Sequence, residues 1–156
     1  MKSKVISHIG KRRTNQDRVL AKKINTDSHL YLIADGMGGY DNGDIAAEMV
    51  IESLTAFLSH SGQFNKNVIH KAINKANLAL RQYQERHQSR LGSTLGGIIV
   101  SGRTAKTFWV GDVKILHYSN GKLRFESKTH NLSSELSETD NQNRSEYFSK
   151  YKHIVT

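Results

Sequence analysis

Short apolar runs separated by polar breaks fill the first part of the chain and predict three strands. They cover residues 5–9, 19–24 and 29–34, a length typical of strands rather than helices. The turn-forming sequence NTDS at residues 25–28 separates the last two runs, which predicts an antiparallel hairpin.

Apolar positions then recur at the three-and-four spacing of a helix with one buried face. The spacing predicts a helix over residues 45–60, with capping residues in 41–44, and a second helix that Asn67 caps and that fades in the polar run 84–90. Short strands are predicted afterwards at residues 95–101, 106–110, 114–118 and 122–125, the last two joined by a turn at Asn120-Gly121. Residues 127–149 are predicted as loop or weak helix and 153–156 as strand-like. This order predicts an α+β fold, with helices packed on a largely antiparallel sheet.

Composition narrows the class of protein. A length of 156 residues suits one domain, 1–156. No apolar run is long enough for a membrane span, and the N-terminus lacks a signal-peptide core. The chain has no cysteine, which excludes disulfide and zinc-thiolate chemistry and fits a cytoplasmic location. The net charge is +9, and eight of the 23 Lys and Arg residues precede Ile24; this indicates a solvated basic face or an acidic partner.

The third apolar run stops at a carboxylate, in the sequence HLYLIADGMGG. Asp35 is followed by Gly36, and a carboxylate with a glycine carbonyl at a strand end suits an oxygen-ligated cation such as Mg²⁺ or Mn²⁺. A plain turn between strand and helix is the alternative. A P-loop is disfavoured, because Tyr40 and Asp41 stand where Lys and Ser/Thr would be needed.

Four short motifs stand in order along the chain. They are Arg12 with Asn15-Gln16-Asp17, then Asp35-Gly36-Met37-Gly38-Gly39, then Gly92-Ser93-Thr94, then Val110-Gly111-Asp112. Together they resemble the metal-dependent Ser/Thr protein phosphatases, the PPM or type-2C family. The resemblance implies an α-β-β-α sandwich, here incomplete at the C-terminus, with two Mn²⁺ or Mg²⁺ ions, and a third looser one, at one end.

The resemblance also implies roles for individual residues. Asp35 would bridge two metals as a catalytic ligand, the Gly36 carbonyl would bind the second metal, and Asp17 would hold that metal directly or through water. Arg12 would bind the substrate phosphate, and Asp112 would hold the third metal. Read without the motif, Arg12 is one more member of the basic cluster, and Asp17 and Asp112 are turn residues. Gly92 to Thr94 is expected to be structural.

The chain departs from the family pattern in three places. Gln16 replaces the usual glutamate, and Val113-Lys114 replaces Ser-Arg. The aspartates that the family supplies near the end of its catalytic domain have no counterpart, which predicts a fragment of a longer product or a decayed or partnered relative.

The resulting hypothesis is a protein serine/threonine phosphatase that acts on a phosphorylated protein, with a cognate Ser/Thr kinase as a further partner. The alternative is an inactive phosphatase-like domain that binds a phosphoprotein or partner chain. Binding to nucleic acid is disfavoured, because no aromatic residue interrupts the basic run 11–18.

Overall fold

The computed structural model describes residues 2–37 and 42–130. The chain divides into two compact units, Met1–Phe108 and Trp109–Thr156, and each is described by itself. That the 156 residues form one domain stays a prediction. None of the helices in the described residues is long and apolar enough to span a bilayer.

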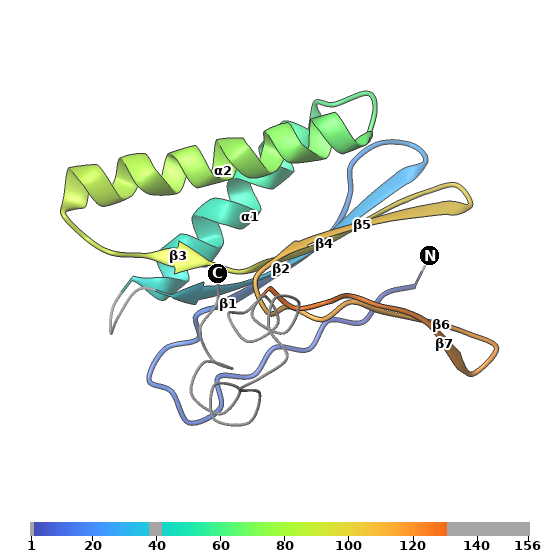
Figure 1. Cartoon of the computed structure of the whole chain (residues 1–156), viewed down its shortest axis with the longest axis horizontal. Coiled ribbons are helices and arrows are strands. Elements are labelled where there is room, and N and C mark those ends of the chain that lie inside the picture. Colours follow the sequence, from blue (N-terminus) through green and yellow to red (C-terminus); the bar gives the residue numbers. More distant parts are fainter. Residues whose placement is uncertain (1, 38–41, 131–156) are drawn as a thin grey trace, which may run out of the picture. The chain divides into compact units, whose positions relative to one another are not determined.

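The first unit contains an antiparallel sheet covered by two helices (Figure 1). The strands follow the order β1-β2-β4-β5, and β3 pairs with the end of β2. The helix α1 packs against both α2 and β2. The α+β class predicted from the sequence is therefore confirmed. The elements are β1 (Asp17–Lys23), β2 (Ser28–Met37), α1 (Gly43–Ser59), α2 (Lys66–His87), β3 (Gly92–Ser93), β4 (Leu95–Ser101) and β5 (Thr104–Val110), the last of which crosses into the second unit.

The core lies between the sheet and the helices. Alternate residues of β2 are buried while their neighbours are more exposed, so one face of the strand points into the core. Leu30 and Leu32 on this face are at most 2% exposed, and Leu54 and Leu58 of α1 are fully buried. Gly97 of β4 has no room for a Cβ atom, because the Phe108 ring occupies that space. The sheet is thus packed against the helices through buried apolar side chains.

The predicted hairpin between the second and third apolar runs is confirmed. β1 and β2 pair along their length, from Asp17 opposite Asp35 to Lys23 opposite His29. In the connecting turn, the backbone N–H of Asp27 donates to the Asn25 side-chain oxygen over 3.0 Å. This side-chain bond is the reason that asparagine favours such a turn.

The prediction that the third strand ends at residue 34 was wrong. β2 continues through Asp35 to Met37, because Gly36 and Met37 pair with Ser93 and Gly92 of β3. The sequence pattern does not predict this extension, because β3 has only two residues and follows β2 in the sequence after both helices, so it leaves no periodic signal. As a result, Asp35 is a residue of the sheet rather than of a loop.

The predicted first strand, residues 5–9, was also wrong. The segment has no regular structure, and Val5, Ile6 and Ile9 are 51%, 74% and 43% exposed. A strand requires a neighbour whose backbone groups complete its hydrogen bonds, and in the described part of the chain no strand pairs with these residues.

Both predicted helices are present, with corrected ends. α1 begins at Gly43 after Asn42, whose side chain makes no capping hydrogen bond, although capping was expected within residues 41–44. The cap of α2 is Asn65 rather than Asn67: its side-chain oxygen accepts the backbone N–H of Val68 over 3.0 Å. α2 runs to His87, within the polar run 84–90 where its end was predicted, and it ends where Gln88 adopts the left-handed conformation.

The described part of the second unit is a two-stranded hairpin, β6 (Leu116–Ser119) paired with β7 (Lys122–Glu126). Asn120 and Gly121 both have positive φ, 52° and 70°, which confirms the predicted two-residue turn. The Lys114 ammonium donates to Glu126 over 2.8 Å, and this exposed contact raises the pKa of Lys114. Residues 127–130 form neither helix nor strand. The remaining predictions, loop or weak helix to residue 149 and a strand at 153–156, lie outside the described residues.

Candidate metal centre

Two of the predicted site residues face each other across neighbouring strands. Asp17 of β1 is directly opposite Asp35 of β2. The Gly36 N–H donates to the Gln16 carbonyl over 3.0 Å, a bond that flanks the pair and makes it a non-hydrogen-bonded pair. In such pairs the Cα atoms are about 4.5 Å apart and the side chains lie on the same face. Both aspartates are half-buried. The fold therefore brings the two carboxyl groups together.

The face that carries the pair can be identified from its neighbours. Ala34 and Gly36, on either side of Asp35, are buried on the helix side of β2. Arg18, next to Asp17, reaches toward Asp44 and Glu48 of α1. Because side chains alternate along a strand, Asp17 and Asp35 point away from the helices.

The backbone of Asp35 is held by the segment that follows α2. Its N–H donates to the Thr94 hydroxyl over 3.0 Å, and its carbonyl accepts the Thr94 N–H over 2.9 Å. The same carbonyl accepts the Ser93 hydroxyl over 3.2 Å. Thr94 is only 2% exposed, so these bonds are shielded from water. The Gly92-Ser93-Thr94 motif thus contacts the site through backbone and hydroxyl groups, as its expected structural role requires.

Gly36 and Gly43 approach so closely that neither position has room for a side chain. A Cβ atom on Gly36 would overlap the backbone carbonyl of Gly43. A Cβ atom on Gly43 would lie 2.7 Å from the Gly36 carbonyl oxygen and 2.7 Å from the Gln16 side chain. The end of β2 is therefore pressed against the first residue of α1.

Arg12 contacts Gln16 from an exposed segment before β1. Its guanidinium donates to the Gln16 side-chain oxygen over 3.0 Å. Gln16 immediately precedes Asp17, and its carbonyl is the one that accepts the Gly36 N–H. Of the predicted site residues, the structure pairs Asp17 with Asp35, the residue before Gly36, and it joins Arg12 to Gln16, the residue before Asp17.

Asp112 belongs to the second unit, where it is exposed and follows Gly111, a residue with a φ of 90°. The Gly111 carbonyl accepts the backbone N–H of His130 over 2.8 Å. The predicted role of Asp112 as a ligand remains a prediction.

The contacts of Arg18 were not predicted from the sequence. One of its nitrogens lies 3.8 Å from Asp44 and 3.6 Å from Glu48, and another donates to the Asn15 and Asp17 carbonyls. A signal was available. Asp44 and Glu48 are four residues apart and therefore lie on one face of α1, and strand alternation turns Arg18 toward them.

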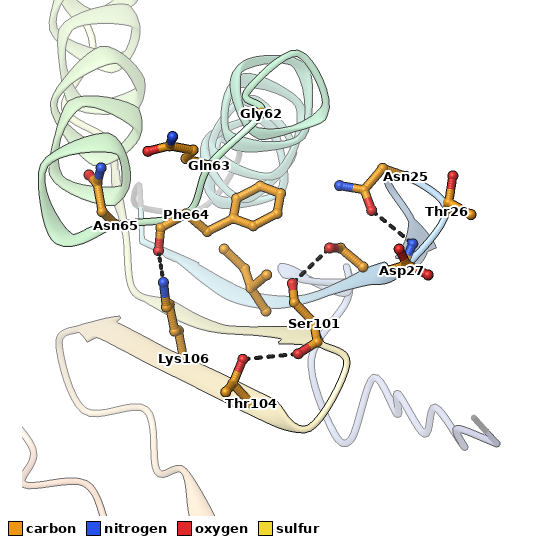
Figure 2. Close-up of a pocket in the computed structure, with 12 residues that line it drawn as sticks. Asn25, Thr26, Asp27, Gly62, Gln63, Phe64, Asn65, Ser101, Thr104 and Lys106 are labelled. Atoms are coloured by element: carbon orange, nitrogen blue, oxygen red, sulfur yellow. Dashed lines mark hydrogen bonds between the residues drawn. The ribbon is translucent and has the colours of Figure 1, made fainter.

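A separate polar cleft of about 610 Å³ lies around the other end of the β1–β2 hairpin (Figure 2). Several of its polar groups bond to one another or to the backbone. The Ser28 and Ser101 hydroxyls are 2.7 Å apart, and the Lys106 ammonium donates to the Phe64 carbonyl over 2.7 Å. These groups are occupied within the protein, so the aspartate pair is the stronger candidate site.

The donor set of the pair fits a hard divalent cation in part. Two like charges directly opposite each other in a sheet are destabilising, and a cation between them reverses the sign of that interaction. Carboxylate oxygens are the ligands that Mg²⁺ and Mn²⁺ prefer. Within residues 2–37 and 42–130, no group of three or more His, Asp or Glu side chains is placed to share one ion. The two aspartates therefore fit as part of a ligand shell.

These features define an α+β protein with a candidate cation site on its sheet. Residues 6–152 match the sequence profile of the protein phosphatase 2C family, and the chain belongs to that family. It is also 30% identical over 137 residues to a Mycoplasma pneumoniae protein assigned as a protein phosphatase. That match covers 80% of this chain and 53% of the relative.

Solved PPM phosphatase structures share the fold. The S. agalactiae serine/threonine phosphatase aligns with a TM-score of 0.78 at 24% identity, over 94% of this chain and 63% of that one. The Mycobacterium tuberculosis phosphatase PstP aligns with a TM-score of 0.75 at 24% identity, over 93% of this chain and 61% of that one. A PstP catalytic domain in complex with two manganese ions aligns with a TM-score of 0.72 at 23% identity, over 92% of this chain and 60% of that one. The chain thus spans between half and two thirds of the length of these relatives.

Proposed function

We propose that the chain acts as a metal-dependent protein serine/threonine phosphatase, in which a dinuclear Mn²⁺ or Mg²⁺ centre activates water for hydrolysis of phosphoserine and phosphothreonine. The observation that carries the proposal is the pairing of Asp17 with Asp35 on one face of the sheet, within a chain of the protein phosphatase 2C family. The manganese ions of the PstP catalytic domain support Mn²⁺ as the natural choice.

Each residue has a role in this proposal. Asp35 and Asp17 would hold the ions together with the Gly36 carbonyl, and Asp112 would hold a third. When bound, the metal supplies a water of lowered pKa and an electrophile for the phosphoryl oxygens. Arg12 would bind the phosphate by a charge-assisted contact, with its guanidinium oriented by Gln16. Thr94 would keep the Asp35 backbone in place.

The proposal extends to partners and location. The substrate would be a phosphorylated protein, and a Ser/Thr kinase that phosphorylates the same protein would be its counterpart. The absence of cysteine from the sequence is in keeping with a cytoplasmic protein.

The alternative is a domain that binds a phosphoprotein or partner chain without hydrolysing phosphate. It is favoured by the ligand count, because the described residues bring together two carboxylates, whereas an oxygen-ligated Mg²⁺ is octahedral. Waters can complete such a shell, and so can residues from elsewhere, so a direct test is needed.

The test is hydrolysis of a phosphothreonine peptide by the 156-residue chain, in Mn²⁺ and in EDTA, with Asp35→Asn beside the unchanged protein. Asp27→Asn is the matched control, because Asp27 is an exposed carboxylate in the turn at the other end of the hairpin. Mn²⁺ affinity is measured on the same proteins by titration calorimetry.

We expect turnover that EDTA abolishes and that Asp35→Asn lowers at least about a hundredfold, as is typical when a group that acts with the metal is lost. Mn²⁺ affinity should fall at least about tenfold in Asp35→Asn and remain unchanged in Asp27→Asn. A folded chain that binds the phosphopeptide without turnover would contradict the enzyme and support the alternative.

A further inference from the structure

We infer that the basic loop, residues 8–14, selects substrates whose acidic residues flank the phosphorylated position. This inference rests on the proposed phosphatase function and adds a substrate class to it. The loop is the segment that carries Arg12 and leads into β1, at the blue end of the chain (Figure 1).

The basic loop has a defined conformation. The Asn15 side chain donates to the Ser7 hydroxyl over 2.8 Å, which ties together two residues eight positions apart. Within the loop, the Gly10 N–H donates to the His8 ring over 2.9 Å, and Gly10 has a φ of 64° that permits a tight turn. The loop is therefore a shaped part of the surface, and its side chains have fixed starting points.

Three consecutive cations stand on this loop. Lys11, Arg12 and Arg13 are all exposed. The ion pairs found within the described residues involve Arg18 and Lys114 but neither Lys11 nor Arg13. Arg12 contacts the neutral amide of Gln16, so its positive charge is not neutralised by that contact. Among the described residues, no carboxylate forms an ion pair with Lys11 or Arg13, so these side chains can interact with an acidic ligand.

The position of these charges relates them to the candidate metal centre. Arg12 donates to the side chain of Gln16, the residue before Asp17, and Lys11 and Arg13 are the immediate neighbours of Arg12 along the chain. A peptide whose phosphate lies at Arg12 would therefore place its flanking residues within reach of Lys11 and Arg13, where acidic side chains are attracted and basic ones repelled.

The experiment compares fluorescence anisotropy of two labelled peptides that carry a non-hydrolysable phosphonate analogue of phosphothreonine, one with glutamates and one with alanines beside it, in Mn²⁺ at low salt. The test variant is Lys11→Glu with Arg13→Glu, which leaves Arg12 in place. Lys22→Glu with Lys23→Glu is the matched control. It changes the net charge equally on exposed residues at the other end of β1. Turnover of p-nitrophenyl phosphate, which has no flanking residues, is measured on all three proteins.

We expect the unchanged protein to bind the acidic peptide about tenfold tighter than the alanine peptide, from two to four exposed charge contacts. The preference should disappear in the loop variant and persist in the control, and the kcat for p-nitrophenyl phosphate, measured at saturating substrate, should be alike in all three. An equal loss of preference in both variants, or no preference at the start, overturns the inference. Absence of p-nitrophenyl phosphate turnover by the unchanged protein overturns the proposed function instead. The two results are distinguishable because the peptide preference is measured by binding and not by turnover.

Discussion

Gln16 connects three parts of the candidate site through different atoms. Its side-chain oxygen accepts the Arg12 guanidinium, its carbonyl accepts the Gly36 N–H, and its side chain packs where a Cβ atom of Gly43 would lie. The amide orients Arg12 without cancelling its charge. A carboxylate at this position would orient the guanidinium as well, but would also neutralise it.

At the residue scale, this difference gives a prediction for Gln16→Glu. The new carboxylate should weaken the binding of phosphate at Arg12, so the KM for a phosphothreonine peptide should rise about threefold to tenfold, in line with a change of about 1 kcal/mol for one charged contact. Steady-state kinetics in saturating Mn²⁺ measure it. Gln63→Glu, an exposed glutamine between the two helices, adds the same charge elsewhere and should leave KM unchanged. An unaltered KM in Gln16→Glu would show that Arg12 does not receive the phosphate.

The sequence could predict the residues of the site better than their contacts. Asp17 was predicted as a ligand from the family motif and Asp35 from the motif and the strand pattern, and the hairpin at residues 25–28 implies that they lie near each other. The role of Thr94 in holding Asp35 depends on a bond between residues 59 positions apart, which no local pattern specifies. Hydrogen-bond partners of this kind are determined by tertiary structure, so they became visible only in the fold.

At the element scale, the start of α2 provides a direct test of the corrected cap. Asn65→Ala removes the side-chain oxygen that accepts the Val68 N–H and should lower the free energy of unfolding by about 1 kcal/mol. Asn67→Ala, one position inside the helix, should be neutral or slightly stabilising, because alanine has the higher helix propensity. Urea denaturation monitored by circular dichroism measures both. The reverse order of effects would restore Asn67 as the cap.

Element existence was more predictable than element ends. The helices and the strand β4 follow periodic or continuous apolar patterns, and the structure has them. The errors fall where pairing partners decide the outcome. β2 is lengthened by β3, and residues 5–9 have an apolar pattern without a paired neighbour in the described residues. Periodicity reports which face of an element can be buried and does not report whether a partner is present.

At the scale of the whole molecule, the two units should differ in local stability. β2 and β4 carry buried residues such as Leu30 and Ile99, whereas the β6–β7 hairpin exposes Leu116 and Tyr118 by 48% and 59%. Segments with few buried apolar side chains need less free energy to open locally. Native-state hydrogen exchange should therefore be about a hundredfold or more slower for the amides of β2 than for those of β6 and β7. Equal protection would show that the hairpin unfolds only together with the sheet.

The contact between Gly36 and Gly43 limits how this part of the sequence can change. The obstacle to a side chain at position 36 is the backbone carbonyl of position 43, and every amino acid carries that carbonyl. No second substitution at position 43 can make room. A larger side chain at position 36 therefore cannot be compensated by a smaller one at position 43. Each glycine must be kept independently of the other. A substitution at Gly36 could be rescued only by a change that shifts the start of α1 itself, and such a shift would also move Asp44 away from Arg18.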